Sequence, residues 1–102
     1  MTKANMLTML EIAVGEPNAS STREAFLTFQ LEMAMQRLTD NGVEFSPTGD
    51  DPDYPLEDSN LIVAYAEFLV QKRDTAEGLP RHLEWAIHNR LIVQNTEGYL
   101  DV

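Results

Sequence analysis

Residues 21–42 constrain the fold more than any other stretch, because they carry the signals of one complete helix. Ser21 is placed to cap its N-terminus, and Glu24 three residues later completes a capping-box pattern. Asn41-Gly42 is typical of a left-handed helix stop. Two adjacent apolar rows recur between these signals: Phe26, Phe29, Met33 and the stem of Arg37, and beside them Leu27, Leu31, Met35 and Leu38. Because two rows need more than one neighbour to cover them, the sequence predicts a central helix at about 21–41 with the other segments packed around it.

Two further stretches on either side of this helix show helical period. Residues 3–14 repeat apolar side chains at three- and four-residue steps, with Thr2 as a candidate cap. Residues 56–74 do the same, and Asp58 or Ser59 is the candidate cap. Each of these helices is expected to dock on the central one, since short helices are marginal alone.

A last helix is predicted at 80–93, because proline is favoured in the first turn of a helix. Its apolar face is predicted to consist of Leu83, Ala86, Ile87 and Leu91, with Trp85 as a further candidate. Residues 94–102 are expected to form a C-terminal tail with two apolar anchors, Tyr99 and Leu100. The predicted fold is therefore all-α, a small bundle of three to four helices in one domain, residues 1–93, followed by this tail.

The segment 43–57 is predicted to be a long irregular loop. It contains three prolines and a glycine, which disfavour regular structure, and it carries Asp50, Asp51 and Asp53 close together. From Asp40 to Asp58 there are seven acidic residues and no basic one. A loop of this length in a small domain is usually functional or disordered.

No pattern typical of catalysis or metal binding is present. His82 and His88 are six residues apart on the predicted last helix, so they point to different faces. The three loop aspartates lack the spacing of a calcium-binding EF-hand loop, and the chain has no cysteine. The sequence therefore predicts no metal, no cofactor and no enzymatic activity.

The composition limits the partners. The chain has 102 residues, 43% of them hydrophobic, which suits one domain with a core. No apolar run approaches the roughly 20 residues that span a bilayer, and no signal-peptide pattern is present, so no membrane association and an intracellular site of synthesis are expected. The net charge of -10 argues against ordinary binding to phosphates or anionic lipids.

Four of the seven basic residues, Lys72, Arg73, Arg81 and Arg90, lie in the last third of the chain. One interpretation is that they compensate helix dipoles and form local ion pairs. The other is that they form a basic surface that pairs with the acidic loop of the next copy in a ring. The sequence leaves both open.

The order of packing and turn signals resembles the small helical head-to-tail connector proteins of tailed bacteriophages, also called head-completion or adaptor proteins. A short helix is followed by a long one, then by an irregular loop, and then by two more helices. The residues that carry the resemblance are Gly15, Leu38, Asn41-Gly42-Val43, Pro55-Leu56-Glu57-Asp58, Ala64-Tyr65, Phe68-Leu69, Gly78-Leu79-Pro80, Leu83, Ala86 and Ile87.

The resemblance implies a structural protein of the virion neck, made in the bacterial cytoplasm. Such proteins form a homo-oligomeric ring, commonly a dodecamer, beneath the portal protein, where they extend the DNA channel and dock the next tail or stopper protein. An acidic lumen lets double-stranded DNA pass without specific binding. Asp50, Asp51 and Asp53 are then expected to face the lumen or the tail side, and Tyr99 and Leu100 to act as portal-side anchors. The loop and the tail are expected to order on assembly.

Two other functions remain open. A small acidic protein can mimic DNA and inhibit a host nuclease or restriction system, but a mimic needs carboxylates spaced over an extended surface. The other is a general helical protein-interaction module, which predicts a monomer or dimer with one apolar groove.

Overall fold

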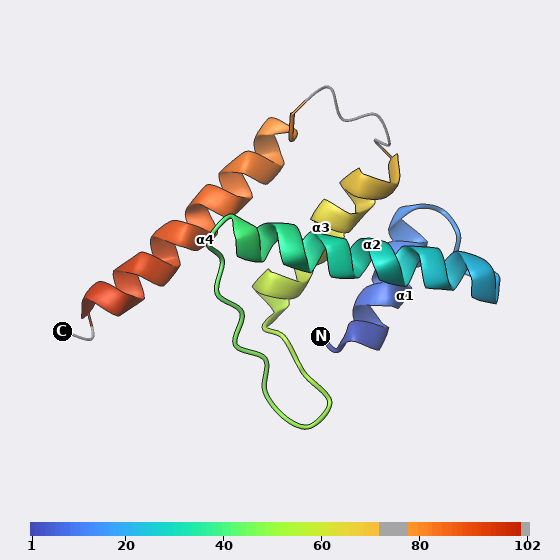
Figure 1. Ribbon diagram of the computed structural model, residues 1–102, viewed down its shortest axis with the longest axis horizontal. Helices are drawn as coiled ribbons and strands as arrows, with labels where there is room; N and C mark the ends of the chain where they lie inside the picture. Colours follow the sequence, from blue (N-terminus) through green and yellow to red (C-terminus); the bar gives the residue numbers. More distant parts are fainter. Residues whose placement is uncertain (72–77, 101–102) are drawn as a thin grey trace.

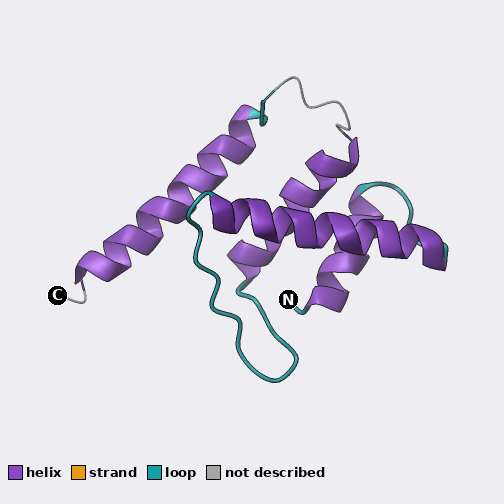
Figure 2. Cartoon of the chain, viewed as in Figure 1, coloured by secondary structure: helices purple, strands orange, loops and turns teal. Residues whose placement is uncertain are grey.

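The described residues of the computed structural model form four α-helices, which confirms the predicted all-α fold (Figure 2). The structure describes residues 1–71 and 78–100, with the side chains of 1–71 and 78–95. The helices are α1 (Lys3–Ala13), α2 (Ser21–Asp40), α3 (Leu56–Gln71) and α4 (Arg81–Leu100). Within this described part, no helix is long and apolar enough to cross a membrane.

The helix at the centre of the packing is α3. It contacts each of the other three helices, whereas α2 packs mainly against α1 and α3. In Figure 1, α1 and α3 lie side by side and α2 crosses in front of both. Helix α4 lies beyond α3, and its C-terminal half extends away from the other helices (Figure 1). The helix predicted as central, α2, is therefore an outer layer with one solvent face.

This arrangement decides which row of α2 is buried. Leu27, Leu31 and Leu38 have no exposed surface, and Ala34 joins them in the core. Phe29, which the two-row pattern placed in the core, is 55% exposed, so that expectation was wrong. The reason is that the helices packed against α2 lie on one side of it, so Phe29 faces solvent although Phe26, on the same row, is half-buried against the core.

The ends of the first two helices follow local signals. The Thr2 hydroxyl accepts a hydrogen bond from the amide of Asn5, 3.3 Å away, which confirms the predicted cap of α1. Ser20, not Ser21, caps α2, because its backbone is extended and its hydroxyl accepts from the amide of Arg23 at 3.3 Å. The predicted Ser21 capping box was therefore wrong. Helix α2 stops as predicted, with Gly42 at φ +102°, a conformation that favours glycine.

The last two helices differ more from the prediction. Asp58 and Ser59 do not cap α3, because both lie inside its first turn and are buried. Helix α4 continues to Leu100 instead of ending near Val93, so no separate tail begins at residue 94. Tyr99 lies in the last turn of α4 with Leu100, but the side chains of both lie outside the described residues.

One buried acid lies where α1 meets α2. Glu11 is only 7% exposed, although it belongs to a short helix at the edge of the domain. Burial raises the pKa of the Glu11 carboxyl, and the nearby negative charge of Glu24 and a hydrogen bond with its side chain raise the pKa further. The folded state therefore prefers the protonated form of the Glu11 carboxyl to its charged form.

We expect Glu11→Gln to stabilise the protein near neutral pH. Because the pKa of Glu11 is raised in the folded state, its contribution is complete below the ordinary glutamate pKa and is lost as pH rises through the raised value. Glutamine removes this loss. Urea unfolding at about pH 7 and about pH 4 should show a gain that shrinks at the lower pH. Glu24→Gln, which removes only the neighbouring charge, should give a smaller gain. A variant less stable than the parent at neutral pH would contradict this assignment.

Candidate protein-interaction surfaces

The acidic loop is folded against the N-terminal segment. Thr48 and Asp53 exchange two backbone hydrogen bonds of 3.1 and 3.0 Å, which close a small turn. At its base, the rings of Phe45 and Tyr54 meet edge to face with centroids 5.9 Å apart. The amide of Tyr54 donates to the carbonyl of Met1 at 2.9 Å. The loop therefore has defined structure in the single chain.

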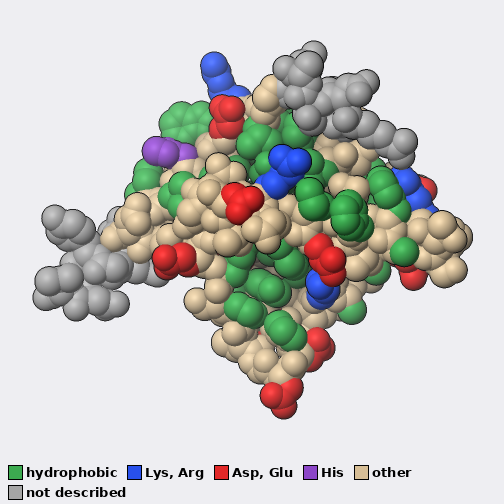
Figure 3. Space-filling view, viewed as in Figure 1, with side chains coloured by type: hydrophobic (Ala, Val, Ile, Leu, Met, Phe, Trp, Pro, Cys, Tyr) green, Lys and Arg blue, Asp and Glu red, His purple; other side chains and the backbone are tan. Residues whose placement is uncertain are grey.

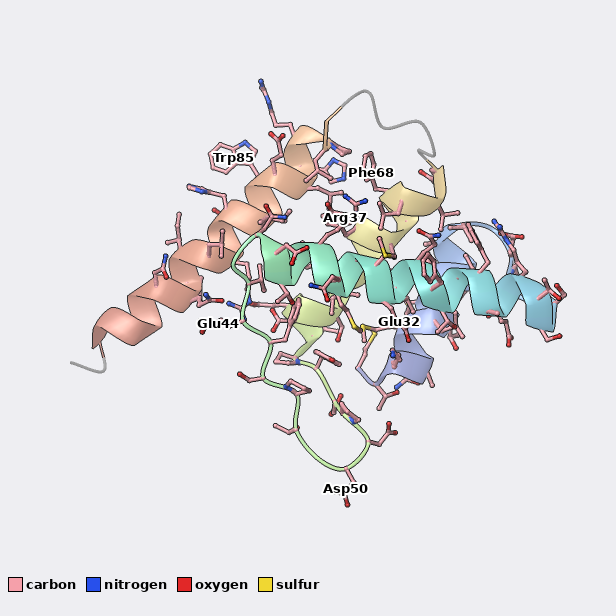
Figure 4. The ribbon with its side chains drawn as sticks, in the orientation of Figure 1. Glu32, Arg37, Glu44, Asp50, Phe68 and Trp85 are labelled. Carbon is pink, nitrogen blue, oxygen red and sulfur yellow. The ribbon has the colours of Figure 1, made fainter. Side chains whose placement is uncertain are left out.

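The three predicted loop aspartates have different surroundings. Asp50 lies at the end of the loop farthest from the helices (Figure 4), and Asp51 is likewise exposed. Asp53 forms an ion pair of 3.0 Å with the amino group of Met1. In the described part of the chain, no three acidic or histidine side chains are placed to hold a metal ion. Asp53 is exposed too but is paired with Met1, whereas Asp50 and Asp51 form no ion pair within the described residues, and their predicted role in a channel stays a prediction.

A polar cluster attaches α4 to the rest of the domain. The Arg90 guanidinium donates to the carboxylate of buried Asp58, with Nε 2.6 Å from Oδ1, and to the carbonyl of Glu44 at 2.7 Å. The Gln94 side chain accepts from the Glu44 amide at 2.8 Å and donates to the Gly42 carbonyl at 2.9 Å. Figure 4 shows Glu44 where the loop leaves α2 beside α4. We call these five residues the Arg90 cluster.

Sequence reasoning missed this cluster, since its members come from three distant segments. It treated Asp58 as a cap and Arg90 as one of a basic group. The structure pairs Arg90 with Asp58, 32 residues away in the same chain, and this is not one of the local ion pairs that the sequence suggested. Arg81 is exposed at the start of α4, while Lys72 and Arg73 lie outside the described residues. The only signal available in the sequence was the four-residue spacing of Arg90 and Gln94 on one helix face.

The outer face of α4 carries an exposed apolar stripe. Trp85 is 59% exposed and Ile92 is 48% exposed, and the His88 ring lies between them in sequence, edge to face with Trp85 at 6.2 Å between centroids. Figure 4 shows Trp85 pointing away from α3, and Figure 3 shows a hydrophobic patch with histidine beside it on this edge. We call Trp85, His88 and Ile92 the outer stripe. The sequence made Trp85 a candidate for the buried face of this helix, and that expectation was wrong. Trp85 lies about 200° around the helix from buried Leu83 and on the same side as Ile92, seven residues later.

A groove of about 400 Å³ runs between α3 and α4, on another side of α4 from the outer stripe. Buried Leu61 and Leu83 form its floor, and the small side chains of Ala64 and Ala86 widen it. Its exposed polar residues are Glu57, Asn60, His82 and Asn89. We call it the α3–α4 groove. Such a concave apolar surface with a polar rim suits a ligand or a protein segment.

The fold and these surfaces define a small all-α protein whose peripheral helix presents two apolar surfaces. No protein-family model, curated protein or solved structure matches the chain. Its function is therefore argued from α4, the groove and the acidic loop.

Proposed function

We propose that the protein is a non-enzymatic structural assembly protein, and that it acts as a head-to-tail connector in the virion neck of a tailed bacteriophage. The observation that carries the proposal is the outer stripe of α4. Trp85 and Ile92 are exposed on a helix that packs mainly against α3. Exposed apolar clusters of this kind mark protein interfaces, and tryptophan is enriched among the residues that dominate binding energy.

In this proposal, the outer stripe contacts the neighbouring copy or the portal protein. A ring interface between copies is heterologous, so it joins two different surfaces of the same protein. The outer stripe supplies one of them. The C-terminal half of α4, which extends from the domain in Figure 1, provides reach toward the portal. Tyr99 and Leu100 at its end remain proposed portal-side anchors.

The acidic loop supports the second part of the proposal. Asp50 and Asp51 project from the helices at the end of an ordered loop, and Figure 3 shows acidic side chains at that end. Like charges repel the DNA backbone, so a ring of such loops around a channel lets the duplex slide without sticking. The opposite side of the ring then docks the next tail or stopper protein.

The proposal is tested by light scattering on the purified chain, alone and mixed with portal rings of tailed phages. A ring-sized species, or a shift of the chain onto the portal, is expected. Trp85→Ala should weaken that association by roughly 30-fold, the loss typical of an interface residue worth about 2 kcal/mol.

Phe29→Ala is the matched control, because Phe29 is a similarly exposed aromatic residue on a different helix, at 55%. It should leave the association unchanged. A chain that ignores portals but binds a basic nuclease would overturn the connector proposal in favour of a DNA mimic. Equal losses for the two variants would remove the outer stripe from the interface.

A further inference from the structure

The α3 side of the groove carries an acidic residue at each end. Glu57 lines the main hollow, and Glu67 lines a second hollow of about 180 Å³ toward Pro80. The two hollows share Ala64, His82 and Leu83, so they form one continuous groove. Ten residues of helix separate the two carboxylates, which is about 15 Å along α3. A helix of about three turns has this length.

The surface between these carboxylates is largely apolar, with the exposed side chain of His82 where the two hollows meet. Leu61 and Leu83 are buried beneath it, and alanines at 64 and 86 allow close approach of another backbone. Figure 4 shows Phe68 between the facing ends of α3 and α4, where it lines the second hollow. The groove therefore matches an apolar helix stripe, with charge recognition at its two ends.

The charge of the groove selects its occupant. Among the described residues, neither Glu57 nor Glu67 has an ion pair, and Glu67 accepts only a hydrogen bond from Gln71 at 3.3 Å. Arg90, the arginine that lines the groove, is engaged by Asp58. In a second copy of the chain, Lys3, Arg23 and Arg90 are already held in ion pairs, so that copy has little positive charge to offer the groove. A basic segment is attracted instead.

We propose that the α3–α4 groove binds a basic amphipathic helix of a partner protein. The apolar stripe of that helix packs over Leu61 and Leu83, and Lys or Arg side chains about three turns apart reach Glu57 and Glu67. Asn60 and Asn89 offer hydrogen bonds to polar side chains along its edges. A helix in the groove leaves the outer stripe free, so this partner is additional to the copies or portal that the stripe contacts.

The test uses a labelled synthetic peptide of about 18 residues with one apolar stripe and lysines about ten residues apart, measured by fluorescence anisotropy. A second peptide keeps the stripe and replaces the lysines by glutamate. We expect the basic peptide to bind, the acidic one not to bind, and the affinity to fall with salt. Absence of binding by the basic peptide would overturn the proposal.

Charge-reversed variants locate the site. Glu57→Lys with Glu67→Lys should weaken binding about tenfold, since exposed ion pairs are worth up to about 1 kcal/mol each. Asp50→Lys with Asp51→Lys changes the net charge by the same amount at the acidic loop and should have little effect. Equal weakening by both pairs would mean non-specific attraction and would overturn the groove assignment.

A third variant tests the apolar part separately. Ala86→Trp places a large side chain at an exposed position in the groove and should block the peptide without changing the charge. If it bound the peptide as the parent does, the groove would not be the site. Trp85→Ala should leave peptide binding intact, so failure of the connector proposal and failure of this one are distinguishable.

Discussion

Leu31→Asp is expected to unfold the domain, whereas Phe29→Asp, two residues away on α2, should change the free energy of unfolding by no more than about 1 kcal/mol. Leu31 has no exposed surface and lies among apolar side chains of α1 and α3, so aspartate there buries a charge without a partner. Phe29 is 55% exposed on the outer side of the same helix. Replacing Phe29 by aspartate therefore loses mainly the contacts of the half of its ring that is buried and some helix propensity.

Urea unfolding followed by far-UV circular dichroism checks this pair of variants. We expect no cooperative transition for Leu31→Asp and a transition close to the parent for Phe29→Asp. Leu31→Ala, a milder change at the same site, should lose about 2–5 kcal/mol, as cavity-forming substitutions do. A folded Leu31→Asp variant, or an unfolded Phe29→Asp variant, would mean that α2 presents its other row to the core.

Asp58→Ala is expected to lower the free energy of unfolding by about 3 kcal/mol, the range for removing one partner of a buried ion pair. Asp58 is buried, and its carboxylate takes two contacts from the Arg90 guanidinium, at 2.6 and 3.4 Å. Alanine removes the carboxylate of Asp58 and leaves Arg90 its hydrogen bonds to the Glu44 carbonyl and the Gln94 side chain. Helix α4 has only Leu83 and Ile87 fully buried among its described side chains, so it depends strongly on this cluster.

The control for Asp58→Ala is Asp51→Ala, which removes the same charge from an exposed loop position and should change stability by less than about 0.5 kcal/mol. Hydrogen exchange then shows which helix the Asp58→Ala substitution destabilises. In Asp58→Ala, the amides of α4 should exchange faster than those of α1, because α4 loses its main polar attachment. Equal stability of the two variants would show that the Arg90 cluster contributes little to holding α4.

The Arg90 cluster also links two of the surfaces on which the proposals rest. Arg90 and Gln94 hold backbone groups of Gly42 and Glu44, which begin the acidic loop. The same arginine lines the α3–α4 groove. The hydrogen bonds of Arg90 and Gln94 therefore connect the base of the acidic loop to the wall of the α3–α4 groove. The position of α4 and the course of the loop are consequently fixed together.

Part of the candidate site was visible in the sequence and part was not. The acidic loop and its exposed residues Asp50 and Asp51 were predicted from composition and proline spacing. The groove was not, because it requires α3 and α4 to lie side by side. The exposure of the outer stripe was not predicted either, for a related reason. Trp85 was a candidate for the buried face, since an apolar residue by itself does not say which side of a helix meets the core.

The sequence by itself determined the all-α class with three to four helices, the cap at Thr2 and the stop at Gly42, because these signals act between residues a few positions apart. Tertiary structure decided which row of α2 is buried, since that depends on α1 and α3 packing on one side only. It also made Asp58 the partner of Arg90, 32 residues away, instead of a cap. A long-range charge pair forms only when the packing of other side chains has brought its two helices together, and no local pattern records that.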